Sequence, residues 1–210
     1  MKKYLSHNGN LLKRGANKFI YRNYTPPQPV IPYVQIGNQI WASENLSIDD
    51  GGDGIAIKYD VTSNGVNFGT QYYYTWVAAK RIVENIEGWR IPTNTDFNNL
   101  RSYLESQEYT TTAPLRCVNG WTDSPYYGEA VPGTDIFGFN IEPVGSIRSS
   151  NPSDNLAAVG EESMLRADDN NDTGRSCNFM YGWSNLQKFT NWVYSWNMPD
   201  AYIAVRLIKE

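Results

Sequence analysis

The chain contains 210 residues, of which 40% are hydrophobic and 19% charged, as expected for a soluble protein with one large domain or one domain and an arm. The net charge of −4 is uneven, because residues 1–29 carry six basic residues and no acidic one, which leaves a formal −10 on the remainder. One histidine, His7, and two cysteines, Cys117 and Cys177, are too few and too scattered for a zinc site, a Cys–His nucleophile pair or a disulfide scaffold.

The first residues are predicted to form an arm followed by a stiff linker. HNGN (7–10) places Asn-Gly between hydrophobic residues, which predicts a short hairpin. Four prolines within residues 25–32 predict an extended spacer. We therefore divide the chain into an arm with its Pro-rich linker, 1–29, and a domain, 30–210. The basic arm suits contact with nucleic acid or an acidic partner, or is simply a solvated tail.

Two kinds of targeting segment are not predicted. The basic start is not followed by the apolar run of about 7–15 residues that a signal peptide needs. No stretch approaches the roughly 18 apolar residues of a membrane span.

The domain opens with a predicted hairpin over 34–41, in which Val34 and Ile36 alternate with Gln35 before a Gly-Asn turn. GIAIKYDVT (54–62) and FGTQYYY (68–74) predict short strands. Residues 75–85 have helical spacing, with Thr75 as the N-cap and a stop at Glu87-Gly88.

EGWRIPTNTDFNNL (87–100) predicts a tight corner between two helices. Residues 89–91 form a short apolar segment between the two helices, and Pro92 ends it. Thr93 and Asp96 then stand in capping-box positions, and the second helix buries the stripe Phe97, Leu100 and Leu104. After Ser106, apolar residues no longer recur with the spacing that predicts a helix. At the end of the chain, AYIAVRLIK (201–209) predicts a strand with Ile203, Val205 and Leu207 on one face.

Five stretches, in this order, resemble the Fibrobacter succinogenes major paralogous domain: IGNQIWASENL, YTWVAAK, GWRIPTNTDFNNL, FGFNIEPVGSIR and AVRLIKE. The resemblance covers about residues 34–210 and extends to the C-type-lectin-like fold of formylglycine-generating enzymes. It implies an α+β, C-type-lectin-like domain with two helices, short antiparallel sheets and long loops, preceded by an extended N-terminal arm. In such a domain the 34–41 hairpin pairs with the terminal strand 201–208, and the last third carries the ligand face.

The chain departs from the family pattern in its last third. VGEESMLRADD (159–169) stands where members have a WWSST-like segment, and Leu207 stands at a position that members fill with cysteine. Cys117 and Cys177 either pair in an oxidising compartment or are two buried free thiols.

Two acidic loops have partial calcium-loop spacing: Asp168, Asn170 and Asp172 in one, and Asp49, Asp53 and Asp60 in the other. Neither has the complete ligand set, and Asp/Gly turns explain both. The EPN and WND signature of sugar-binding lectins is absent. The domain also lacks a histidine, a nucleophile elbow and a phosphate loop, so we expect no metal, no cofactor and no catalytic residue.

Residues 177–202 combine aromatic rings with asparagines, a composition typical of a binding surface. The alternative is that about half of these rings belong to the core, because strands alternate. The predicted ligand-binding residues are Asn178, Tyr181, Trp183, Asn191, Trp192, Tyr194, Trp196 and Asn197.

Three functions remain open from the sequence. The leading hypothesis is a non-enzymatic recognition module, a virion surface or fibre protein of a phage that binds a host-cell glycan or protein receptor. Its residues 1–29 would dock onto other virion proteins, and it would form a homo-oligomer, by analogy a trimer. The second hypothesis is an exported binding protein on the cell surface of Bacteroidetes. The third, an oxidase of the formylglycine-generating type, would need a cysteine pair as its copper site.

Overall fold

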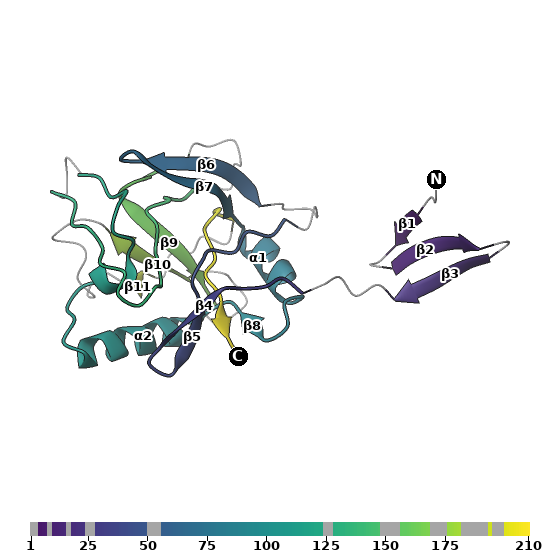
Figure 1. The fold of residues 1–210 in the computed structure, drawn as a ribbon, viewed down its shortest axis with the longest axis horizontal. Coiled ribbons are helices and arrows are strands. Elements are labelled where there is room, and N and C mark those ends of the chain that lie inside the picture. The colour runs from purple at the N-terminus through teal and green to yellow at the C-terminus, as the bar shows by residue number, and fades with distance from the viewer. Residues whose placement is uncertain are drawn as a thin grey trace. The chain divides into compact units, whose positions relative to one another are not determined.

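The computed structural model describes residues 4–7, 10–15, 18–23, 28–49, 56–123, 128–147, 156–168, 176–181, 193–194 and 200–210 (Figure 1). For the strands within 4–23 and 176–194 it describes the backbone alone. The chain forms two compact units, Met1–Val30 and Ile31–Glu210. In the described part, no helix is long and apolar enough to cross a bilayer.

The first unit is a three-stranded antiparallel sheet. Strands β1 (Tyr4–His7), β2 (Asn10–Gly15) and β3 (Lys18–Asn23) follow one another in the order β1-β2-β3. His7 pairs with Asn10, which confirms the hairpin predicted from HNGN. The third strand was not predicted, although KFIYRN contains the aromatic and β-branched residues that strands favour.

The second unit contains a four-stranded sheet with the order β4-β5-β12-β8. Its strands are β4 (Tyr33–Ile36), β5 (Gln39–Ala42), β8 (Trp89–Arg90) and β12 (Ile208–Lys209). Ile208 pairs with Trp41 on one side and with Arg90 on the other. This register confirms both the 34–41 hairpin and its pairing with the end of the chain. Gly37 has φ 59° in the β4–β5 turn, a conformation that favours glycine.

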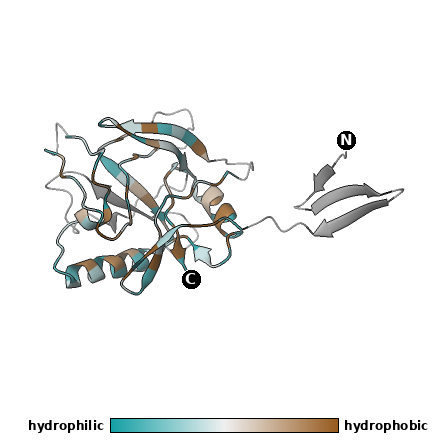
Figure 2. Ribbon diagram, in the orientation of Figure 1, coloured by the Kyte–Doolittle hydropathy of each residue, from teal (hydrophilic) through white to brown (hydrophobic). Residues whose placement is uncertain are grey.

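Both predicted helices are present, and each begins at the predicted cap. In α1 (Trp76–Val83) the Thr75 side chain accepts a hydrogen bond from the backbone N–H of Ala78. In α2 (Asn94–Ser106) Thr93 and Asp96 form a reciprocal capping box. Figure 2 shows hydrophobic and hydrophilic residues alternating along α2, and Phe97, Leu100 and Leu104 are its buried apolar residues, as predicted.

Two further antiparallel sheets and a short 3₁₀ helix complete the second unit. The hairpin β6 (Ile57–Ser63) and β7 (Val66–Tyr73) matches the predicted short strands. The other sheet has the order β11-β10-β9, with β9 at Glu162–Ala167, β10 at Ser176–Tyr181 and β11 at Val193–Tyr194. The 3₁₀ helix η1 covers Ala113–Leu115. Two helices with short antiparallel sheets make this an α+β domain.

The terminal segment 201–208 lies at the centre of the core, and all eight of its residues are buried. Ala204 and Ile208 pack in the cluster that contains α2, whereas Val205 and Leu207 pack in the cluster that contains α1. The sequence predicted one apolar face, at 203, 205 and 207, but the structure buries the opposite face as well.

The prediction of a regular strand over 201–209 was wrong in its extent. Residues 202–204 form isolated bridges to three separate partners, Ile147, Tyr74 and Leu165, and regular pairing is confined to β12. A segment that links several sheets changes its partner at each residue, and alternation in the sequence does not reveal this.

Candidate functional site

Three of the eight predicted ligand-binding residues lie in described strands: Asn178 and Tyr181 in β10, and Tyr194 in β11. In this sheet Asn178 pairs with Val193, and Tyr194 pairs with Cys177. Asn178 and Tyr194 therefore lie on adjacent strands, one residue apart in register. The other five predicted residues lie outside the described residues: Trp183, Asn191, Trp192, Trp196 and Asn197. A binding surface built from these eight residues stays a prediction.

The acidic residues of the two possible calcium loops are described in part. The carboxylate of Asp49 forms an ion pair with Lys58 at 2.6 Å, and the carboxylate of Asp60 accepts a hydrogen bond from the Thr70 hydroxyl at 2.6 Å. The backbone N–H of Asp168 donates to the carbonyl oxygen of Pro92. Asp53, Asn170 and Asp172 lie outside the described residues.

Cys117 is a free, buried thiol, so the possible pairing with Cys177 is not formed. Its Sγ lies 3.0 Å from the carbonyl oxygen of Asn119. Burial, helped by the negative charge of Glu142, raises the pKa of the Cys117 thiol to about 12. The thiol is therefore protonated at neutral pH and is a poor metal ligand and nucleophile.

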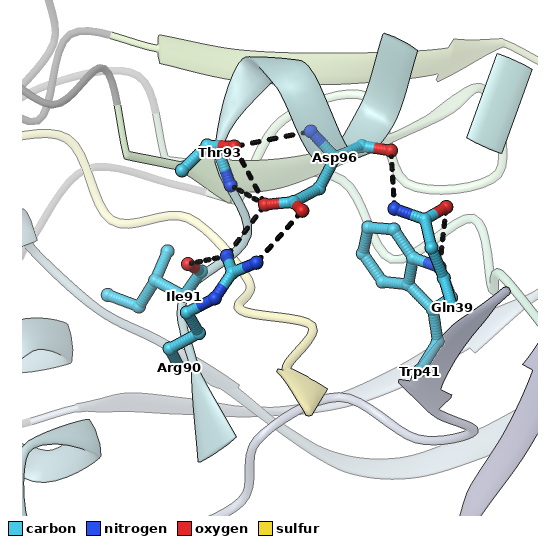
Figure 3. A network of polar contacts seen from close by, with 6 residues as sticks. All are labelled: Gln39, Trp41, Arg90, Ile91, Thr93 and Asp96. Atoms are coloured by element: carbon cyan, nitrogen blue, oxygen red, sulfur yellow. Dashed lines mark hydrogen bonds and ion pairs between the residues drawn. The ribbon is translucent and has the colours of Figure 1, made fainter. Parts of the chain in front are cut away.

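The corner predicted from EGWRIPTNTDFNNL is held by a polar network around Asp96 (Figure 3). Its carboxylate accepts hydrogen bonds from the backbone N–H of Thr93 at 2.6 Å and from the Thr93 hydroxyl at 2.7 Å. The two terminal nitrogens of Arg90 donate to the same carboxylate at 2.6 and 2.9 Å. Gln39 donates to the backbone carbonyl of Asp96 at 2.9 Å, which ties the corner to strand β5. These polar groups position α2 against the sheet.

Asp96 is ionised because its hydrogen bonds outweigh its burial. Burial favours the protonated carboxyl, but the hydrogen bonds from Arg90 and Thr93 and the charge of Arg90 together hold the pKa of Asp96 below its usual value. The same partnership raises the pKa of Arg90.

A polar pocket of about 300 Å³ lies where four separate segments meet. These segments are the loop after β5, strand β7, residues 140–142 and the terminal segment. Most of the lining side chains are polar. The lining residues are Glu44, Asn45, Leu46, Ser47, Phe68, Thr70, Gln71, Tyr72, Asn140, Glu142 and Arg206.

Side-chain amides join the walls of the polar pocket. Gln71 donates through Nε2 to the Glu142 carboxylate at 3.0 Å and to the carbonyl oxygen of Phe68 at 2.9 Å. Asn45 donates to the side-chain oxygen of Gln71 at 3.5 Å, and Asn140 donates to Glu142 at 3.4 Å. The pocket therefore has a continuous hydrogen-bonded wall whose geometry does not depend on a ligand.

Arg206 lines the polar pocket and is 1% exposed. Its Nη1 donates to the carbonyl oxygens of Phe139 at 2.6 Å and Ala42 at 3.2 Å, and its Nε donates to the side-chain oxygen of Asn45 at 3.1 Å. A fourth bond runs from Nη2 to the carbonyl oxygen of Asn140. Burial lowers the pKa of Arg206 to about 10, so the guanidinium remains charged at neutral pH.

Two carboxylates give the polar pocket a negative character. Glu44 is exposed at the pocket, whereas Glu142 is half-buried. Burial raises the pKa of Glu142, and the charge of Arg206 with the hydrogen bonds from Asn140 and Gln71 oppose that shift only in part.

A second cavity, of about 370 Å³, lies beside α1 and β8 and is more apolar. Trp76 and Trp89 contribute to its wall together with Arg90 of the corner. The indole Nε1 of Trp76 is buried and has no hydrogen-bond partner in the described part of the chain.

The sequence did not predict the polar pocket, because its residues are far apart along the chain. A signal was nevertheless present: three stretches that carry the family resemblance, SENL (43–46), FNIEP (139–143) and VRLI (205–208), all contribute to its lining. The sequence of each stretch, taken alone, does not indicate that the three meet at one pocket.

A model of the Fibrobacter succinogenes major domain matches residues 34–209, which include every residue of the polar pocket. No curated protein and no solved structure gave a match to the chain.

Proposed function

Because the chain belongs to the Fibrobacter succinogenes major domain family, and the matched stretches converge on one pocket, we propose that it is a non-enzymatic recognition module. The polar pocket would bind a ligand on the surface of a host cell, a glycan or a protein receptor. The observation that carries this proposal is the hydrogen-bonded wall formed by Asn45, Gln71 and Glu142, which the buried Arg206 joins through Asn45. A wall held by the fold itself favours binding, because little ordering is needed when the ligand arrives.

The proposed location is the surface of a phage particle. The first unit is compact by itself and carries the basic residues of 1–29, which suits attachment to other, acidic virion proteins. A homo-oligomer, such as the trimer common in fibres, would multiply weak contacts at the host surface. The second candidate location is the cell surface of Bacteroidetes, where the same pocket would serve an exported protein.

For the fold we propose the C-type-lectin-like architecture. Two features support it: the β4–β5 hairpin pairs with the terminal strand β12, and two helices pack on the clusters that this terminal segment joins. The oxidase alternative is less favoured, because a buried thiol with a raised pKa at Cys117 is unsuited to copper binding.

The pocket can be tested with a substitution that fills it. Ser47 is exposed and lines the polar pocket, so Ser47→Trp would occupy the pocket from its rim. Ser102→Trp, on the exposed face of α2, is the matched control. We expect the labelled full-length chain to bind cells from a panel of Bacteroidetes in flow cytometry, and Ser47→Trp alone to abolish the signal. Equal binding by both variants would refute the pocket as the ligand site.

The location requires a separate measurement. Mass spectrometry of purified virions should detect this chain. Its absence from virions and presence in bacterial membranes would favour the cell-surface protein.

The eight residues predicted in the last third are a second candidate surface. If binding survives Ser47→Trp but is lost in Trp192→Ala or Trp196→Ala, with unchanged circular dichroism, the ligand binds there and not in the polar pocket.

A further inference from the structure

The hydrogen-bond donors of the polar pocket are largely engaged within the protein. Gln71 directs its Nε2 at both Phe68 and Glu142, and the amide nitrogens of Asn45 and Asn140 also donate within the wall. Four N–H groups of Arg206 point at protein oxygens, out of the five that a guanidinium has. The acceptors that the pocket offers a ligand are chiefly the carboxylate oxygens of Glu44 and Glu142, which can each accept more than one hydrogen bond.

The charge of the pocket also favours a ligand that brings hydrogen-bond donors. Its lining contains two carboxylates, Glu44 and Glu142, and one guanidinium, Arg206. Arg206 donates its hydrogen bonds to carbonyl and amide oxygens. Within the described residues, neither Glu44 nor Glu142 forms an ion pair with Arg206. An acceptor-rich site of net negative charge favours a ligand that brings donors and a positive charge.

The size and polarity of the pocket restrict the ligand further. Its volume of about 300 Å³ is at the small end of the range for ligand sites, so it suits one ring better than a chain. Ser47 and Thr70 add hydroxyl groups to the lining, and Tyr72 adds an aromatic side chain. A lysine side chain, in contrast, has an apolar stem that this lining would not match.

We infer that the polar pocket binds an amino sugar, a single pyranose ring whose free ammonium group lies against the carboxylates of Glu142 and Glu44. The hydroxyl groups of the ring donate to the remaining acceptors of the wall. This inference rests on the proposed function, because it names the ligand class of the same pocket.

The test compares four small probes with the full-length chain by isothermal titration calorimetry at about pH 6, where amines are protonated. Three are methyl glycosides that share one ring: glucosaminide with a free amine, glucoside and glucuronide. The fourth, an Nα-acetyl-lysine amide, presents the same ammonium group on a protein side chain. We expect the glucosaminide to bind about tenfold tighter than the glucoside, and the glucuronide to bind most weakly.

A charge-neutral variant identifies the carboxylate. Glu44→Gln removes a charge from an exposed residue and is expected to lower the affinity for the glucosaminide several-fold while leaving the glucoside unchanged. Glu105→Gln, an exposed position on α2, is the matched control and should change neither.

The outcomes separate this inference from the proposed function. Equal affinities for glucosaminide and glucoside, or tighter binding of the lysine probe, would overturn the amino sugar. The absence of binding by all three glycosides would also overturn the amino sugar. In each of these cases, loss of cell binding in Ser47→Trp would still support the polar pocket as the ligand site. If Ser47→Trp binds cells as the wild type does, the polar pocket is not the ligand site, and the part of the proposed function that places binding in this pocket fails.

Discussion

The guanidinium of Arg206 lies over the ring of Phe139, 5.0 Å from its centroid, and donates to the carbonyl oxygen of the same residue at 2.6 Å. The same Nη1 also donates to the carbonyl oxygen of Ala42, and Nε donates to the side-chain oxygen of Asn45. One buried cation thus joins the end of the β4–β5 hairpin and the loop after it, residues 139–140, and the terminal segment of the chain. Its planar fork suits this role, because several acceptors can be satisfied in fixed directions.

Replacing Arg206 by lysine should destabilise the domain strongly. A lysine ammonium cannot span the same acceptors, and unsatisfied buried groups each cost about 1–3 kcal/mol, so we expect a loss of about 2–4 kcal/mol. Urea unfolding followed by tryptophan fluorescence would measure it. Arg101→Lys, in a surface ion pair with Glu105, is the control and should lose less than about 1 kcal/mol. Similar losses in both variants would contradict the structural role of Arg206.

Asp96→Asn should weaken the corner in a pH-dependent way. The folded pKa of Asp96 lies below its usual value, so the carboxylate contributes stability above about pH 4 and loses that contribution as the pH falls further. At pH 7 we expect a loss of about 1–2 kcal/mol, because a cap is damaged and the Arg90 partner is partly exposed.

The check is urea unfolding of wild type and Asp96→Asn at pH 7 and at about pH 3. The difference between the two proteins should shrink at the lower pH. A difference that is constant with pH would show that the ionised carboxylate is not what stabilises the corner.

Gly145 and Gly69 provide a matched pair, because their φ angles are 67° and 68°. A Cβ at Gly69 meets no atom within 4 Å, whereas a Cβ at Gly145 overlaps the carbonyl oxygen of Ala157. Gly69→Ala should therefore lose about 1–2 kcal/mol from the left-handed conformation alone. Gly145→Ala should lose about 1–3 kcal/mol more, since backbone has to move. Thermal unfolding of the two variants would measure this, and equal losses would refute the close approach.

Cys117 should resist alkylation in the native protein. Cys117 is 8% exposed, and burial raises the pKa of its thiol to about 12, so almost none of it carries the reactive thiolate at pH 8. Iodoacetamide labelling followed by peptide mass mapping distinguishes Cys117 from Cys177. We expect Cys117 to be labelled in urea and to remain unlabelled in buffer. Labelling in buffer at the rate seen in urea would contradict the burial of this thiol.

The sequence by itself determined the features that depend on near neighbours along the chain. Thr75 and Thr93 identified both helix starts, and the Gly-Asn pair at 37–38 identified the β4–β5 hairpin, because caps and tight turns involve residues at most four positions apart. The family resemblance added the pairing of Trp41 with the end of the chain.

Only the tertiary structure decided what the non-local contacts do. The terminal segment alternates like a surface strand, yet both of its faces are buried because each contacts a different core cluster. Arg206 appears in the sequence as one charged residue in an apolar run, and only packing surrounds it with carbonyl oxygens. The polar pocket arises for the same reason: hydrogen bonds between Asn45, Gln71 and Glu142 require three segments to meet, and residue spacing carries no record of that meeting.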